Sequence, residues 1–284
     1  MNLHIELPPD HPGFCDPEYR GRRDAIATLA DRWRPGDPLP RAPYTAAEHA
    51  VWAELWGELE AAHADRVCAE LLECERGLAL PGHRIPQLPE VEAKLVATTG
   101  FRLAPVPGLV DARRFLSCLA DGRFLSTQYV RHASRPRYTP EPDVIHELVG
   151  HAGSLAHPGI AHLSRRFGQV ARAVDEAGLL RLERVYWFTL EFGLCQEQGQ
   201  LRAVGAGLLS SVGELAGIET GPRLCDWDIE TIANTPYDTT RMQDQLFVAP
   251  SFAVMLRDIV DWLDGEEQRA RDVPPARRGM LRSA

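Results

Sequence analysis

The chain has 284 residues, of which 44% are hydrophobic and 25% are charged, and its formal net charge at pH 7 is −9. This composition is that of an ordinary globular protein, and the negative charge disfavours nucleic acid or an anionic membrane surface as a partner, because both attract basic proteins. No stretch approaches the roughly 18 apolar residues of a membrane span, and the amino-terminal residues lack a signal-peptide pattern. We therefore expect a cytoplasmic protein with a small-molecule ligand.

The length suits one large domain, which we assign to residues 1–265. The remaining residues, 266–284, are charged, contain a Pro-Pro pair and lack apolar periodicity, so we expect a disordered tail there. Six cysteines without a C-x-x-C pair predict reduced thiols rather than a disulfide framework.

In the first half of the chain, apolar residues recur mainly at helical spacing. Ile26, Leu29 and Trp33 mark one helix, and Thr45 and Glu48 form a capping-box pattern at the start of the next. Further helices are expected at 68–76, before Gly100 and at 111–121, and extended segments at 101–106 and 124–130.

In the second half, helices are expected near 143–150, 159–176, 180–196 and 251–269, with a short strand at 201–204. We find no internal repeat. The pattern as a whole predicts a mainly α-helical fold with a few short β-strands, in the α+β class.

The most informative motif is His146-Glu147-Leu148-Val149-Gly150-His151, followed 40 positions later by Glu191. Two imidazoles and one carboxylate form a facial set of ligands that leaves open positions on a metal, which suits non-haem Fe(II). The sequence therefore indicates one divalent metal held by His146, His151 and Glu191.

The spacing of the two histidines leaves alternatives open. Zinc hydrolases carry two histidines four positions apart on a helix, whereas His146 and His151 are five apart. Five steps of about 100° place the side chains roughly 140° apart on a regular α-helix. We therefore expect the helix to end near Gly150, with His151 just beyond it. From the spacing alone, iron, zinc and a metal-free histidine pair all stay possible.

Several longer motifs carry a resemblance to a known family. They are RHASRPRYTPEPD at 131–143, YWFTLEFGLC at 186–195, GAGLLSS at 205–211, LPPDHPGF at 7–14, IPQL at 85–88, TGFRL at 99–103 and PVPGL at 105–109. In order and content they resemble the catalytic domain of the tetrahydropterin-dependent aromatic amino acid hydroxylases, over roughly residues 5 to 264.

The resemblance implies roles for individual residues. His146, His151 and Glu191 match the iron ligands, Glu147 matches a catalytic carboxylate near the pterin, and Asp143 matches an acid that orients an imidazole. The residues that match the pterin site are Gly108, Val110, Ala112, Phe115, Glu147 and Tyr186.

For the amino acid substrate, the resemblance implies a bidentate pair between Arg131 and the substrate carboxylate. The other matching pocket positions are Tyr138, Thr139, Pro142, Trp187, Phe192, Gly207 and Ser210. On the residues alone, Phe115, Trp187 and Phe192 fit a hydrophobic core equally well.

The implied activity is ring hydroxylation of an aromatic L-amino acid with Fe(II), tetrahydrobiopterin or another tetrahydropterin, and O2. L-phenylalanine, giving L-tyrosine, is the leading substrate. Trp187 favours phenylalanine or tyrosine over tryptophan, because it matches a position that is usually phenylalanine in tryptophan hydroxylases. The alternatives are hydroxylation at the meta position, hydroxylation of tryptophan and, more remotely, a zinc hydrolase. The family's regulatory domain and tetramerisation helix have no match here, so we expect a monomer.

One departure from the family concerns the residues after His151. The family usually has Val-Pro-Leu there, whereas this chain has Ala152-Gly153-Ser154. Because smaller side chains leave more room, we expect a looser substrate pocket.

Overall fold

The structure is a computed structural model that describes residues 7, 9, 11–137, 139, 141–239 and 241–272. Its first part is largely helical. The elements up to the metal motif are α1 (Pro17–Arg32), α2 (Ala46–Arg66), α3 (Ala69–Leu78), α4 (Leu88–Thr98), β1 (Arg102–Pro105), α5 (Ala112–Leu119) and β2 (Arg123–Ser126).

The second part contains two π-helices, η1 and η2. Its elements are η1 (His146–Ala152), α6 (Gly153–Leu155), α7 (Pro158–Ala171), α8 (Glu176–Tyr186), η2 (Trp187–Glu191), β3 (Leu194–Glu197), β4 (Gln200–Ala203), α9 (Ala206–Leu209), α10 (Val212–Gly217), β5 (Arg223–Asp226), α11 (Ile229–Asn234), β6 (Gln245–Ala249) and α12 (Phe252–Asp272). The mainly helical fold with a few short strands agrees with the sequence expectation.

Side-chain caps explain where several helices begin. Asp16, Asp111 and Asp175 accept backbone hydrogen bonds at the starts of α1, α5 and α8. The predicted capping box is confirmed at α2, where Thr45 and Glu48 each accept from the other's backbone N–H. These caps satisfy donors that a helix leaves without intrahelical partners.

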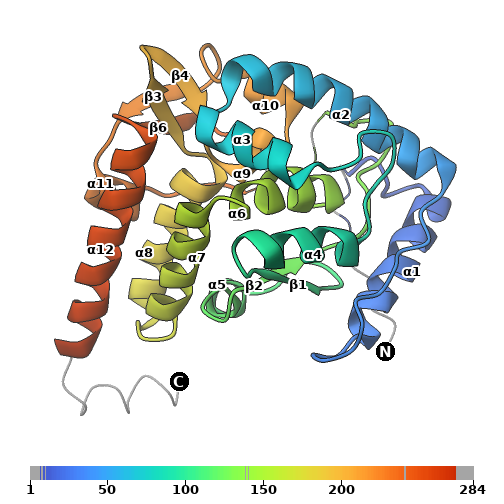
Figure 1. Cartoon of the computed structure of the whole chain (residues 1–284), viewed down its shortest axis with the longest axis horizontal. Helices are drawn as coiled ribbons and strands as arrows, with labels where there is room; N and C mark the ends of the chain where they lie inside the picture. Colours follow the sequence, from blue (N-terminus) through green and yellow to red (C-terminus); the bar gives the residue numbers. More distant parts are fainter. Residues whose placement is uncertain are drawn as a thin grey trace.

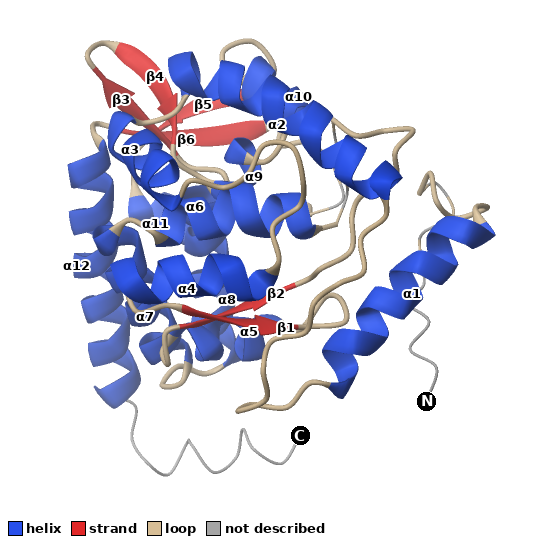
Figure 2. Ribbon diagram, turned by 45° about the vertical axis from the view of Figure 1, so that its right-hand side comes forward, coloured by secondary structure: helices blue, strands red, loops and turns tan. Residues whose placement is uncertain are grey.

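The strands form two small sheets. β1 and β2 are parallel, with Arg102 opposite Arg123 and Pro105 opposite Ser126. The larger sheet has the order β4-β3-β6-β5, in which only the β3–β4 pair is antiparallel. Helices lie between the two sheets (Figure 2), and α1 and α12 lie at opposite edges of the molecule (Figure 1).

The hydrophobic core surrounds the metal motif. One cluster of buried residues includes Trp52, Phe101, Phe167 and Phe188, and it also contains Leu148 of η1. Residues 147–152 are all buried. The motif therefore lies within the core, where packing fixes the direction of its side chains.

Several element boundaries differ from the expectation. The helix expected at 180–196 ends at Glu191, and residues 194–197 form β3 instead. The strands β3, β5 and β6 were not predicted. The extended segment expected at 124–130 pairs as a strand only as far as Ser126. α12 continues to Asp272, so residues 266–272 are helical rather than part of a tail, and Glu266 is buried. Residues 273–284 lie outside the described part of the chain.

Within the described residues, no helix combines the length and the apolar character that crossing a bilayer requires.

Candidate metal centre and adjoining pocket

The two histidines of the motif are brought together by a π-helix. His146 and His151 are the first and sixth residues of η1, which continues directly into α6. A π-helix bonds residue i to residue i+5, so side chains five positions apart share a face. The expectation that the helix ends near Gly150 was therefore wrong, because it assumed the spacing of an α-helix.

Gly150 has a packing role instead. A Cβ at this position would lie 2.4 Å from the carbonyl oxygen of Ala206. Any side chain would therefore push α9 away from η1. Since Ser210 directly follows α9, Gly150 sets how closely Ser210 approaches the histidines.

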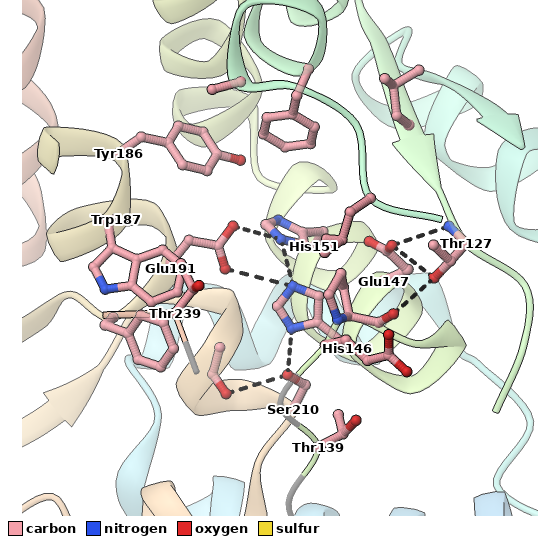
Figure 3. A pocket seen from close by; sticks show the side chains of 18 of the residues that line it. Thr127, Thr139, His146, Glu147, His151, Tyr186, Trp187, Glu191, Ser210 and Thr239 are labelled. Atoms are coloured by element: carbon pink, nitrogen blue, oxygen red, sulfur yellow. Dashed lines mark hydrogen bonds and ion pairs between the residues drawn. The ribbon is translucent and has the colours of Figure 1, made fainter. Parts of the chain in front are cut away.

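Three side chains converge on one point. Nε2 of His146 lies 3.0 Å from Nε2 of His151, and Nε2 of His151 lies 2.9 Å from Oε1 of Glu191. Oε2 of Glu191 is 3.6 Å from Nε2 of His146, and all the ligand atoms lie within 4.8 Å of one another (Figure 3). Bonds of about 2.1 Å place neighbouring ligands of an octahedral metal roughly 3 Å apart. The donor set therefore fits one octahedral metal with a face left open.

Ser210 fixes the tautomer of His146. The Ser210 hydroxyl donates to the carbonyl of Ala206 at 2.8 Å and lies 3.0 Å from Nδ1 of His146. Because its single proton goes to Ala206, the hydroxyl accepts from Nδ1–H. This leaves Nε2 of His146 unprotonated and free to bind a metal.

The electrostatics favour metal binding by His146 and Glu191, whereas His151 must give up a proton that it holds more tightly than usual. Burial, together with the nearby His151, lowers the pKa of His146 to about 4, so this ring is neutral at pH 7. Burial alone would raise the pKa of Glu191, but His151 holds it below its ordinary value. The Glu191 carboxylate in turn outweighs burial and raises the pKa of His151. A neutral imidazole and a carboxylate are the forms that metals bind.

Glu147 faces away from the ligand triad toward Thr127 (Figure 3). Its Oε1 accepts from the backbone N–H of Thr127 at 3.1 Å and from the Thr127 hydroxyl at 3.0 Å. Glu147 is only 4% exposed, and burial raises its pKa to about 7. The carboxyl group can therefore hold or release a proton near neutral pH.

One cavity of about 390 Å³ brings the candidate residues together. Its lining includes His146, His151, Glu191, Glu147, Gly108, Val110, Ala112, Phe115, Tyr186, Arg131, Thr139, Pro142, Trp187, Phe192, Gly207 and Ser210. Tyr138, also expected there, lies outside the described residues.

The cavity has two sides around the ligand triad. On one side, the rings of Phe115 and Tyr186 meet edge to face, with centroids 5.6 Å apart. On the other side, Trp187 stacks on Tyr237 with centroids 4.7 Å apart. Figure 3 shows Tyr186 on one side of the histidines and Ser210 and Thr139 on the opposite side. The arrangement offers separate places for two flat ligands next to one metal.

Arg131 is buried and already paired. Its Nε and Nη2 atoms donate to the two carboxylate oxygens of Asp143, at 2.9 and 2.7 Å. Its Nη1 atom makes longer bonds to the carbonyls of Pro136 and Ser210, at 3.1 and 3.4 Å. The fork that was expected to bind a substrate carboxylate is thus held by Asp143, so a ligand at Arg131 would use the second N–H of Nη2 or displace a carbonyl from Nη1.

Two other expectations were wrong. Asp143 accepts from the backbone N–H of His146 and from Arg131, so it does not orient an imidazole; Ser210 does. Ala152 is the last residue of η1, and Gly153 and Ser154 begin α6; all three are buried, and none of them lines the cavity. Their small size therefore gives no reason to expect a looser pocket.

Sequence reasoning also missed residues that line the cavity. They include Thr127, Glu183, Ser211, Glu214, Tyr237 and Gln243. Thr127 and Glu214 carry no local signature, because a Thr after a strand and a Glu in a short helix are common surface patterns. Only the folded chain brings them to the site.

Comparisons with known proteins agree with this site. A family model described as biopterin-dependent aromatic amino acid hydroxylase matches residues 1–269. Human tyrosine 3-monooxygenase is 44% identical over 253 residues, which are 87% of this chain and 48% of that protein. Rat phenylalanine-4-hydroxylase is 42% identical over 260 residues, 89% of this chain and 57% of that protein. The chain thus spans about half the length of the curated relatives it matches.

Solved structures give the same result. The structure of Chromobacterium violaceum phenylalanine hydroxylase with bound oxidised Fe(III) has a TM-score of 0.75 and 32% identity, covering 84% of this chain and 88% of that one. Phenylalanine hydroxylase from Legionella pneumophila has a TM-score of 0.73 and 32% identity, covering 81% and 92%. The chain therefore belongs to the family of biopterin-dependent aromatic amino acid hydroxylases.

Proposed function

We propose that this chain is an iron- and tetrahydropterin-dependent monooxygenase that converts L-phenylalanine to L-tyrosine. The proposal rests mainly on one observation: the imidazoles of His146 and His151 and the carboxylate of Glu191 converge at the wall of a cavity that has aromatic residues on two sides. Family membership supports it and argues against the zinc hydrolase that the histidine spacing left open.

The metal would be held by His146, His151 and Glu191. When bound, the iron and the reduced pterin supply the electrons that activate O2 for insertion of one oxygen atom into the ring. Ser210 keeps the unprotonated Nε2 of His146 turned toward the metal, and the buried surroundings of the triad keep water from competing.

The pterin would lie against Phe115 and Tyr186, with the loop at 108–110 along its polar edge. Both aromatic rings line the cavity, and neither ring is fully buried. Glu147 lines the same cavity, and its Oε2 atom is the place where a proton is held or released, since Oε1 accepts from Thr127. Its pKa of about 7 suits proton transfer at neutral pH.

The amino acid would lie on the other side of the triad. Trp187 and Phe192 meet with ring centroids 4.7 Å apart and provide an apolar wall for the aromatic ring. Thr139, Pro142, Gly207 and Arg131 line the cavity and would hold the amino acid backbone. Holding the ring in one orientation beside the metal is the main contribution that the protein makes to rate and to ring position.

The substrate choice rests on Trp187 and on the solved relatives, which are phenylalanine hydroxylases. The experiment supplies purified protein with Fe(II), tetrahydrobiopterin and O2 together with L-phenylalanine, L-tyrosine or L-tryptophan, and identifies products by chromatography. We expect para-tyrosine from phenylalanine. Meta-tyrosine, dihydroxyphenylalanine or 5-hydroxytryptophan as the main product would mean that the chain has the activity of a different hydroxylase of this family. No product from any amino acid would overturn the proposal.

A matched pair of variants connects the activity to the metal. His151→Ala should lose both iron and activity, whereas His157→Ala should keep both, since His157 caps α7 and pairs with Glu70 away from the cavity. The monomeric state and the cytoplasmic location remain predictions from the sequence; light scattering tests the first of them.

A further inference from the structure

Glu214 is a partly buried acidic residue of the cavity that the proposed chemistry does not use. It lies in α10 and lines the same cavity as the ligand triad. Its Oε2 atom is buried and, within the described structure, has no hydrogen-bond partner. Burial raises the pKa of Glu214 to about 7, although the backbone N–H of Gln243 acts in the opposite direction. A buried carboxylate oxygen without a partner is costly, so its presence needs a reason.

A local structural role does not account for the side chain. Ser211 and Glu214 have the spacing of a capping box, in which the Glu carboxylate would return to the backbone N–H of Ser211. Only half of that motif is present: the Ser211 hydroxyl accepts from Glu214 N–H at 3.3 Å, but the Ser211 N–H donates to the carbonyl of Leu208. The carboxylate is therefore not used as a cap.

The cations of the cavity wall do not neutralise Glu214 either. Arg131 is paired with Asp143, at 2.7 Å. Arg241 is paired with Asp238 and Asp244, at 3.3 Å each. Glu214 is thus a carboxyl group at the wall of a cavity whose arginines already have carboxylate partners. A cationic group of a ligand would stabilise its ionised form.

The position of Glu214 indicates which cation fits. Ser210 lies four residues before Glu214, at the end of α9; its carbonyl accepts from Nη1 of Arg131 at 3.4 Å, and its hydroxyl contacts His146. Figure 3 shows Ser210 next to the histidines, on the side away from Tyr186. Arg131 and Glu214 both line this cavity, and Arg131 contacts Ser210, four residues before Glu214 in the chain. An α-amino acid carries an ammonium and a carboxylate on one carbon, and it requires an anion and a cation placed in this way.

We propose that Glu214 binds the α-ammonium group of the amino acid substrate, while the guanidinium of Arg131 attracts the α-carboxylate. The inference rests on the proposed function for the identity of the substrate, but it concerns binding rather than the oxygen chemistry. It predicts that this protein recognises the complete zwitterion. An analogue that lacks the ammonium group should bind poorly, because it leaves the Glu214 carboxylate buried without a partner.

The test is equilibrium binding by calorimetry to the Fe(II)-loaded protein without O2. The two ligands are L-phenylalanine and 3-phenylpropionate, which differ only in the ammonium group. The variants are Glu214→Gln, which keeps the shape and removes the charge, and Glu219→Gln, an exposed glutamate just after α10 that serves as the control. Wild type should bind phenylalanine about 10- to 100-fold more tightly than 3-phenylpropionate, as expected for a charge-assisted hydrogen bond. Glu214→Gln should lose most of that preference by weakening phenylalanine alone, and Glu219→Gln should keep it.

Three results would overturn the inference: equal weakening of both ligands in Glu214→Gln, unchanged binding of phenylalanine in that variant, or equal affinity of wild type for the two ligands. The last comparison needs no variant, so it decides the question even if Glu214→Gln does not fold. Failure of the proposed function can be distinguished from failure of this inference. If wild type prefers phenylalanine over 3-phenylpropionate but hydroxylates no amino acid, the ammonium site is supported and the monooxygenase assignment is wrong.

Discussion

The hydroxyl of Ser210 lies 3.0 Å from Nδ1 of His146, so that one side chain connects the substrate side of the cavity with a metal ligand. Ser210 follows α9, which packs against η1 through the close contact at Gly150. Whatever moves α9 therefore also changes the hydrogen bond that orients His146. Groups that hold a ligating imidazole in this way tune both the affinity and the geometry of a metal site.

Ser210→Ala should weaken Fe(II) binding by about 10- to 100-fold, because His146 loses the acceptor that fixes its tautomer. Metal titration followed by elemental analysis measures the change. Ser134→Ala is a matched control, since the Ser134 hydroxyl contacts Nδ1 of His132 at 2.8 Å on the surface, away from the triad. Equal iron affinity in Ser210→Ala and Ser134→Ala would show that the hydrogen bond does not support the metal.

Metal affinity should rise with pH. In the metal-free protein the Glu191 carboxylate raises the pKa of His151 above its usual 6.5, so the ring keeps its proton to higher pH than an ordinary imidazole, and the metal must displace that proton. Below the raised pKa this competition weakens binding, and above it the competition disappears. Fe(II) titrations from about pH 6 to about pH 8, with proton release recorded in weakly buffered solution, measure both effects. A dissociation constant that does not change over this range, without proton release, would contradict the prediction.

The buried carboxyl of Glu147 should make stability depend on pH. Burial raises its pKa from 4.5 to about 7, so the folded protein binds a proton that the unfolded chain has lost, and stability falls as pH rises from about 4.5 to 7. Glu147→Gln removes this loss, so the metal-free variant should gain stability over wild type at pH 8 but not at pH 4.5, by at most about 3 kcal/mol. Thermal unfolding at both pH values measures the difference, and Glu219→Gln is the control. The same difference at both pH values would mean that Glu147 is not the titrating group.

Gly150→Ala should destabilise the protein by about 1–3 kcal/mol, because the added Cβ would lie 2.4 Å from the Ala206 carbonyl oxygen and would push α9 away. Iron affinity should fall with it, since Ser210 moves with α9. The control is Gly153→Ala in α6, where a Cβ meets nothing within 4 Å, so the change should be neutral or stabilising. Denaturant unfolding of both variants measures the effect. Equal stability of the two would contradict the packing role of Gly150.

The sequence predicted the identity of the site better than its geometry. The long motifs led to the family, and the residues that match its metal, pterin and substrate positions line one cavity wherever the structure describes them. The conformation of the metal motif was not predictable from local rules. Residues 146–151 form a π-helix, which is rare. On an α-helix, two histidines five positions apart would point in different directions and could not bind the same metal.

Other features depended on contacts between distant segments. β3 was missed because residues 186–195 form an apolar run that also fits a helix, and only its pairing with β4 and β6 makes residues 194–197 a strand. The turn between β3 and β4 has positive φ at Gln198 and Gly199, which matches a two-residue hairpin turn. The buried environment of Glu214 likewise exists only once α10 packs beside the cavity.

The most direct test of the account is the source of the oxygen in the product. Wild-type protein is supplied with Fe(II), tetrahydrobiopterin, L-phenylalanine and ¹⁸O₂, and the tyrosine formed is analysed by mass spectrometry. If this site activates O2 for ring hydroxylation, one ¹⁸O atom is incorporated per tyrosine, and omission of the pterin or the Glu191→Ala substitution abolishes product formation. Tyrosine without ¹⁸O, or product formation that persists without the pterin, would contradict the proposed function.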